Sequence, residues 1–164
     1  MASASSTSEE GGAEPGVCRG NLKKPGCGSA LNVVVDSSVV VAALVDTGDN
    51  GTWAEKILER DDLYAPELLR VETANVLRRL ERGKEITEQE ANAAFEDLME
   101  LNVELHEFER LSERVWELRH NVTSYDGWYV ALAEALNLPL ATLDGRLVKA
   151  EGPKCRFWTP DSDF

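Results

Sequence analysis

The stretch Val33-Val34-Val35-Asp36-Ser37-Ser38 places three β-branched apolar residues directly before an acid and two hydroxyl side chains. A second stretch near the other end of the chain, Leu138-Pro139-Leu140-Ala141-Thr142-Leu143-Asp144, also runs from apolar residues into an acid. Short apolar runs of this kind, separated by helical segments, are typical of buried strands in a parallel sheet. Open parallel sheets bind ligands just beyond the carboxyl ends of their strands. Asp36 and Asp144 therefore indicate a binding crevice.

The remainder of the chain alternates strand and helix, which predicts an α/β fold with one parallel sheet and helices on both of its faces. The predicted strands, about five in number, span residues 31–36, 63–65, 103–108, 138–143 and 156–158. The predicted helices span residues 37–45, 52–60, 66–82, 87–100, 110–119 and 124–137, with a short helix before the last strand. Pro66 suits the first turn of its helix, and Thr87-Glu88-Gln89-Glu90 resembles a capping box.

Residues 1–30 are rich in Ser, Gly, Glu and Ala, so we expect a disordered N-terminal tail, and a single domain over residues 31–164. No apolar run reaches the roughly 18 residues of a membrane span. The N-terminus lacks the apolar segment of a signal peptide. We therefore expect a cytoplasmic protein that does not enter the membrane. Three cysteines give no disulfide framework, and Cys18 and Cys27 make a poor zinc site without further ligands.

The formal net charge is −13, from 30 acidic and 17 basic residues. This balance argues against a protein that holds nucleic acid by a basic surface, because phosphate binding relies on Lys and Arg. It does not exclude a nuclease in which a bound metal supplies positive charge locally, and it favours a basic protein partner. The arginines of the third predicted helix are expected to form a solvated face, or alternatively to guide RNA phosphates: Arg70, Arg78, Arg79 and Arg82.

Glu72 interrupts an apolar helical stripe formed by Leu69, Val76 and Leu80. A buried carboxylate needs a partner, a proton or a metal. One interpretation is a metal or catalytic site, and the other is a salt bridge to an arginine of the same helix. The helix alone does not decide between them.

Asp126 lies in the first turn of a helix that Thr123 or Ser124 caps, where a negative charge complements the helix dipole. It also shares an inward stripe with Tyr129 and Val130, so its carboxylate is expected to point at the sheet. Asp36 and Asp144 each have a second interpretation as ordinary helix caps. Four such coincidences are less economical than one shared pocket of oxygen ligands, which would suit Mg²⁺ or Mn²⁺.

Four segments then supply a resemblance: residues 33–38, 66–77, 125–134 and 140–144. Their order and spacing resemble the PIN-domain ribonucleases, and most closely the VapC-type toxins of bacterial and archaeal toxin–antitoxin pairs, over about residues 31–160. The resemblance implies a PIN-like three-layer fold, an RNA substrate, a cognate antitoxin and a homodimer. It also implies a catalytic Mg²⁺ site, with Mn²⁺ as a substitute, whose residues are Asp36, Glu72, Asp126 and Asp144, supported by Ser37 and Ser38.

Metal-assisted hydrolysis of RNA phosphodiester bonds is the function that this resemblance implies. One alternative is a PIN-like scaffold that binds a partner without cutting. A less favoured alternative is a phospho-acceptor receiver domain, which also has acids at strand ends. A receiver would need a paired acid after the first strand and a Lys after a late strand, whereas Ser37 follows Asp36 and no such Lys is present. His106 and His120 have no acid–base constellation around them.

Overall fold

A computed structural model describes residues 32–60 and 62–162. The predicted tail over residues 1–30 lies outside this part of the chain. Five strands form one sheet: β1 (Val33–Val35), β2 (Leu63–Pro66), β3 (Glu104–His106), β4 (Leu140–Ala141) and β5 (Phe157–Trp158). The helices are α1 (Ser37–Val45), α2 (Asp49–Leu58), α3 (Leu69–Gly83), α4 (Glu88–Glu100), α5 (Ser112–Glu117), the 3₁₀ helix η1 (Leu118–His120), α6 (Ser124–Leu136) and α7 (Gly145–Val148).

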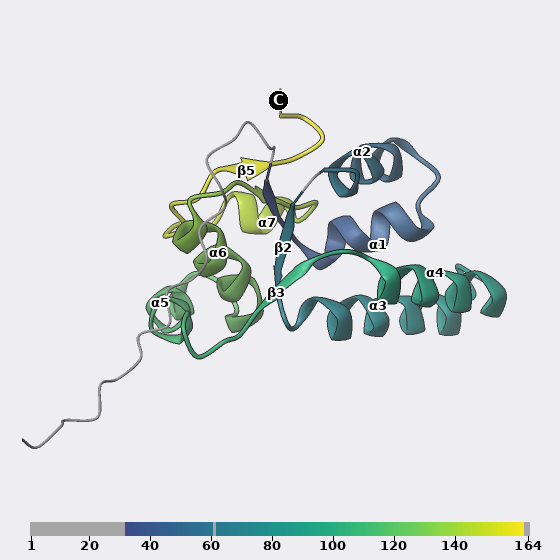
Figure 1. The fold of residues 1–164 in the computed structure, drawn as a ribbon, viewed down its shortest axis with the longest axis horizontal. Coiled ribbons are helices and arrows are strands. Elements are labelled where there is room, and N and C mark those ends of the chain that lie inside the picture. The colour runs from purple at the N-terminus through teal and green to yellow at the C-terminus, as the bar shows by residue number, and fades with distance from the viewer. Residues whose placement is uncertain (1–31, 61, 163–164) are drawn as a thin grey trace, which may run out of the picture.

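The strand order is β3-β2-β1-β4-β5, and every pairing is parallel. Helices α5, α6 and α7 lie on one side of the sheet, and α1 and α2, with the α3–α4 hairpin, lie on the other (Figure 1). The predicted α/β class, the parallel five-stranded sheet and the covering helices are thereby confirmed. A receiver domain would have the order 2-1-3-4-5 instead, so that alternative is wrong.

This strand order positions the candidate site. The chain moves outward from β1 in one direction through β2 and β3, and in the other through β4 and β5. The junction between β1 and β4 is therefore a topological switch point, where the loops that follow the two strands diverge and leave a crevice. Asp36 follows β1, and Thr142 and Asp144 follow β4, at this same edge.

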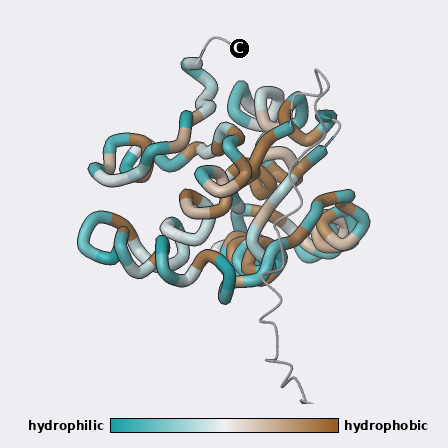
Figure 2. Tube along the Cα trace, turned by 60° about the vertical axis from the view of Figure 1, so that its left-hand side comes forward, coloured by the Kyte–Doolittle hydropathy of each residue, from teal (hydrophilic) through white to brown (hydrophobic). Residues whose placement is uncertain are grey.

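The core surrounds β1, whose three valines are each 0% exposed. Branched side chains fit a pleated strand that is covered on both faces. Helix α6 packs against β1, β2 and β4. Almost every residue of this helix from Gly127 to Ala133 is buried. Figure 2 shows the hydrophobic segments gathered in these central strands and helices. The site is thus built on the buried centre of the molecule.

Helix α3 begins at Leu69, so the predicted start at Pro66 is wrong. Pro66 ends β2, where it pairs with His106, and the Glu67 N–H donates to the His106 carbonyl at 3.1 Å. The fixed φ of proline suits an extended strand end as well as a first helical turn, and pairing with β3 decides the outcome. The observed strands β1, β3 and β4 are shorter than predicted, α2 begins earlier at Asp49, and the helix predicted over 110–119 is divided into α5 and η1.

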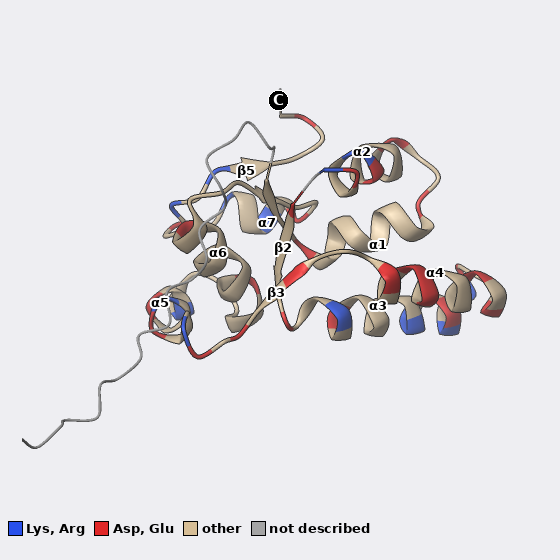
Figure 3. Ribbon diagram, viewed as in Figure 1, with Lys and Arg blue, Asp and Glu red and all other residues tan. Residues whose placement is uncertain are grey.

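The α3–α4 hairpin follows its local sequence closely. The predicted capping box is present: the Thr87 N–H donates to Glu90 Oε2 at 2.7 Å and the Glu90 N–H donates to Thr87 Oγ1 at 3.2 Å. Basic residues lie along the outer side of α3 and acidic residues along α4 (Figure 3). Arg78, Arg79 and Arg82 are exposed as predicted. Arg70 is half-buried, with a buried Nε that has no hydrogen-bond partner among the described residues, so the prediction of a solvated side chain is wrong there.

Within residues 32–60 and 62–162, every helix is too short or too polar to cross a membrane.

Candidate active site

Asp36 is a buried carboxylate held by hydroxyl groups. Its side chain, in a residue 8% exposed, accepts hydrogen bonds from Ser37 Oγ at 3.3 Å, Ser38 Oγ at 2.8 Å and Thr142 Oγ1 at 2.6 Å. It stands at the N-cap position of α1 but makes no side-chain cap bond, so the capping interpretation of this carboxylate is wrong. Among the described residues no Lys, Arg or His forms an ion pair with it. Its negative charge is therefore buried without a neutralising side chain.

Two hydroxyls hold the ends of β1 and β4 together at this point. Ser38 Oγ accepts from the Leu143 N–H at 3.0 Å, and Thr142 Oγ1 accepts from the Asp144 N–H at 3.0 Å. Each hydroxyl thus bonds Asp36 with its proton and the β4 segment with its oxygen. Thr142 is 0% exposed, and sequence reasoning did not identify it as a site residue. Its position two residues before Asp144, at the end of a buried strand, could have indicated a hydroxyl at the site.

Glu72 lies at the border of the buried face of α3, whose buried residues are Leu69, Thr73 and Leu77. The Tyr129 hydroxyl of α6 donates to Glu72 Oε2 at 2.7 Å. Burial raises the pKa of Glu72, the Tyr129 hydrogen bond opposes this, and the charges of Asp36 and Asp126 raise it further. No arginine forms an ion pair with Glu72 in the described part of the chain, so the salt-bridge alternative is wrong.

Asp126 lies in the first turn of α6, behind the N-cap Thr123. The Thr123 hydroxyl donates to Asp126 Oδ2 at 2.7 Å. Burial raises the pKa of Asp126, the Thr123 hydrogen bond opposes this, and the charges of Asp36 and Asp144 raise it further. The carboxylate is half-buried and lies within electrostatic reach of two acids from other elements, as its inward stripe predicts.

Asp144 differs from the other three acids because it caps a helix. Its Oδ1 accepts the Arg146 N–H at 2.8 Å at the start of α7, and Arg146 Nη2 lies 3.4 Å from its Oδ2. Burial acts to raise the pKa of Asp144, but the hydrogen bonds and charge of Arg146 outweigh it and hold the pKa below its usual value. The capping interpretation is therefore correct for Asp144, and this acid has a local partner that Asp36 lacks.

The four acids form a chain of neighbouring charges in which Asp36 acts on Glu72 and Asp126, and Asp144 acts on Asp126. As the side chains stand, no three Asp, Glu, His or Cys residues in the described ranges are arranged to hold a metal ion. The donor set nevertheless fits a hard divalent cation, since it consists of carboxylate and hydroxyl oxygens alone. The buried, unneutralised Asp36 is the feature that such a cation would match.

A cavity of about 480 Å³ opens beside Asp126 and Asp144. Its walls come from η1, the start of α6 and α7, and its lining includes Arg119, His120 and Arg146. These basic groups face the same space as two of the acids.

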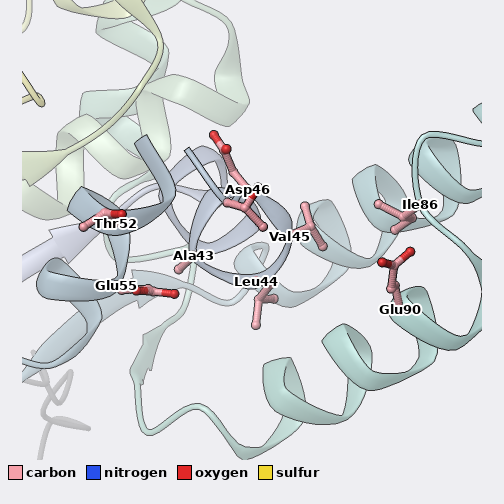
Figure 4. A pocket seen from close by; sticks show the side chains of 9 residues that line it. Ala43, Leu44, Val45, Asp46, Thr52, Glu55, Ile86 and Glu90 are labelled. Carbon is pink, nitrogen blue, oxygen red and sulfur yellow. The ribbon is translucent and has the colours of Figure 1, made fainter. Parts of the chain in front are cut away.

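A second cavity of about 400 Å³ lies away from the four acids, between the C-terminal end of α1, helix α2 and the turn of the α3–α4 hairpin (Figure 4). Three carboxylates are among its lining residues: Asp46, Glu55 and Glu90. Asp46 Oδ1 accepts the Gly48 N–H at 2.8 Å and Glu90 belongs to the capping box, so two of the three are bonded to nearby backbone.

Comparison with known proteins identifies the family of this chain. The PIN domain family matches residues 33–153. Ribonuclease VapC1 of Mycobacterium tuberculosis is 43% identical over 125 residues, which cover 76% of this chain and 94% of the relative. The structure of VapBC2 of Rickettsia felis bound to a promoter DNA fragment shares the fold with a TM-score of 0.56 and 14% identity, over 78% of this chain and 98% of that one. The sarcin–ricin-loop-cleaving toxin VapC20 of M. tuberculosis shares it with a TM-score of 0.55 and 18% identity, over 71% of this chain and 92% of that one. The chain thus belongs to the PIN domain family and, within it, to the VapC ribonucleases.

Proposed function

We propose that this chain is the ribonuclease toxin of a toxin–antitoxin pair, an endoribonuclease that hydrolyses RNA phosphodiester bonds with the help of a divalent metal ion. The relationship to VapC1 and the fold shared with the toxin VapC20 support the activity. The observation that carries the proposal is the buried Asp36, bonded by hydroxyls and placed beside two acids whose pKa values are raised. Perturbed acids clustered at a strand-end crevice are characteristic of a functional site.

Asp36, Glu72, Asp126 and Asp144 would hold the cation, which we propose is Mg²⁺ with Mn²⁺ as a substitute. A divalent cation supplies a Lewis acid that offsets charge on the phosphate and makes water a nucleophile near neutral pH. Ser37, Ser38 and Thr142 orient Asp36, and Tyr129 orients Glu72. Glu72, whose orientation is fixed by the Tyr129 hydroxyl, would either complete the ligand set or position the attacking water.

The charge arrangement also predicts that metal and protons compete for the site. Without a cation, Asp36, Glu72 and Asp126 repel one another, and the raised pKa values of Glu72 and Asp126 express this repulsion together with burial. Binding of a divalent cation would favour the ionised carboxylates and release protons.

The proposal is tested by RNA cleavage and thermal unfolding with Mg²⁺ or Mn²⁺ and with EDTA. We expect cleavage with metal only, and a stabilisation of about 2.7 kcal/mol at a metal concentration a hundredfold above Kd. The double variant Asp36→Asn, Asp126→Asn should lose both effects while remaining folded. Cleavage that persists in EDTA, or a full metal-induced shift in the double variant, would contradict the assignment. A folded parent that binds metal and cuts no RNA would favour the alternative of a partner-binding scaffold.

We also propose an antitoxin partner and a homodimer. The α3–α4 hairpin exposes three large apolar side chains, Val71, Phe95 and Met99, at 68%, 47% and 48%, and unpartnered apolar groups on a hairpin indicate a protein contact. The acidic cavity of Figure 4, at the turn of this hairpin, suits a basic antitoxin segment. Sedimentation at micromolar concentration should show a species heavier than the 18.1 kDa chain. A monomer would contradict the dimer.

A further inference from the structure

Two arginines and a histidine line the 480 Å³ cavity beside the candidate active site. Arg119 and His120 come from η1, and Arg146 comes from α7. The chain carries a net charge of −13, and two of the candidate metal ligands, Asp126 and Asp144, line the same cavity. Two arginines therefore lie beside the candidate active site of a protein whose net negative charge would otherwise repel a polyanion.

The wall that carries Arg119 and His120 is fixed in place by the loop after α7. Asn121 Nδ2 donates to the Glu151 carbonyl at 2.8 Å, and Arg114 Nη2 donates to the Gly152 carbonyl at 2.9 Å. Gly152 has a φ of 104°, and a Cβ at this position would lie 2.9 Å from Asn121 Nδ2. Only glycine fits this approach comfortably. The cavity therefore has a built wall and is not a chance gap between loops.

The Arg119 guanidinium is itself held in position. Its Nη1 donates to the Trp116 carbonyl at 2.7 Å, and its guanidinium carbon lies 4.8 Å from the centroid of the Trp116 ring. A guanidinium has five N–H groups, so most of its donors remain available after this one hydrogen bond. Stacking on an aromatic ring reduces the conformational entropy that the side chain would lose on binding an anion.

Arg146 is weakly engaged by its own neighbour. Its side chain is 94% exposed, and its shortest distance to Asp144 is 3.4 Å. Exposed ion pairs of this length contribute little to stability. Arg146 Nε and Nη2 each lie 3.4 Å from an Asp144 oxygen, which leaves Nη1 and the second N–H of Nη2 to donate to a phosphate that approaches Asp144.

We propose that this cavity binds the backbone phosphate next to the scissile bond of a single-stranded RNA, with Arg119 and Arg146 as the phosphate contacts and His120 as a further donor. This inference rests on the proposed function and adds where the substrate strand lies. A volume of 480 Å³ is within the range of small-ligand sites, about 300–1,000 Å³, and suits one nucleotide unit. Arginine contacts to phosphate would offset the repulsion between the acids and the RNA.

The test measures binding without cleavage. The probe is a fluorescein-labelled single-stranded RNA of about 12 nucleotides, titrated with Mg²⁺ present in an Asp36→Asn background, so that the RNA stays intact. We expect Arg119→Ala and Arg146→Ala each to raise Kd about tenfold, the order of one charge-assisted hydrogen bond. The slope of log Kd against log salt should fall by about 0.7 for each contact removed. Arg119→Lys should recover part of the salt slope, because it keeps the charge.

Lys56→Ala is the control, since it removes one positive charge from an exposed position on α2, outside this cavity and outside the arginine face of α3. It should leave Kd within about twofold of the background protein. Circular dichroism and thermal melts establish that each variant is folded. Arg119→Ala and Arg146→Ala proteins that bind RNA like Lys56→Ala, with an unchanged salt slope, overturn the inference. The proposed nuclease activity is decided separately, by cleavage with the parent protein.

Discussion

The carboxyl edge of β1 and β4 and the α3–α4 hairpin are both rich in acids, but the burial of those acids and the direction of their pKa shifts differ. On the hairpin, Glu90 is exposed and accepts hydrogen bonds from the Thr87 backbone and hydroxyl, which lower its pKa. At the sheet edge, Asp36 is buried among hydroxyls, and burial raises the pKa of Asp126. Burial also raises the pKa of Glu72, the one acid of the hairpin that contacts Tyr129 of α6 beside this edge. Burial without a cationic partner, rather than the number of acids, therefore distinguishes a site from a solvated helix.

The largest expected effect separates these two regions directly. Asp36→Asn removes the charge that a cation would balance, so RNA cleavage should fall by at least about a hundredfold while the protein stays folded. Glu90→Gln is the control, since it removes an equal charge from the hairpin and should leave the cleavage rate unchanged. Both are measured by a cleavage assay together with circular dichroism. An Asp36→Asn protein that cuts at the parental rate would remove the distinction between the regions.

Thr142→Val tests the hydroxyl support of the sheet edge. The change keeps the shape of the side chain but deletes the bond to Asp36 and the acceptor for the Asp144 N–H. Leaving two buried polar groups unsatisfied should cost about 1–3 kcal/mol of unfolding free energy and also reduce cleavage. Urea unfolding measures the first effect. If Thr142→Val unfolds like the parent, the hydroxyl is not needed to hold the buried carboxylate.

The smallest effect concerns pH. The folded-state pKa of Glu72 is raised above its ordinary value of 4.5, so the folded protein binds more protons than the unfolded chain just above that value. The stability of the metal-free protein should therefore decrease as pH rises through this window. Glu72→Gln should remove part of this decrease, and in EDTA near neutral pH it should be as stable as the parent or more stable by about 0.5 kcal/mol.

For Asp144, the dependence of stability on pH is expected to have the opposite sign, and Asp144→Asn should remove it. The folded-state pKa of Asp144 is lowered from 3.8, so its contribution is present above that value and lost as pH falls through the folded pKa. Thermal melts in EDTA from about pH 3.5 to 8 compare the two variants. A Glu72→Gln protein less stable than the parent at neutral pH would show that Glu72 stabilises the fold rather than strains it.

Some features of this protein follow from the sequence alone because they depend on residues only a few positions apart. The apolar runs 33–35 and 140–141 form strands, Thr87 and Glu90 form the capping box, and Thr123 caps α6. The acids at 36, 72, 126 and 144 could be chosen as site candidates from helical and strand periodicity together with the family resemblance. Pro66 could not be placed, because its φ fits both a helix start and a strand end.

The tertiary structure decided which role each acid has. Whether Asp36 caps a helix depends on Thr142, which lies 106 positions away and donates a hydrogen bond to it. Whether Glu72 forms a salt bridge depends on Tyr129, 57 positions away. Arg119, His120 and Arg146 share a cavity only because the folded chain brings η1 and α7 to the same hollow. The burial and the hydrogen bonds that shift the pKa of a carboxyl group come from residues distant in sequence, so local patterns name the candidates and the packing of the chain assigns their chemistry.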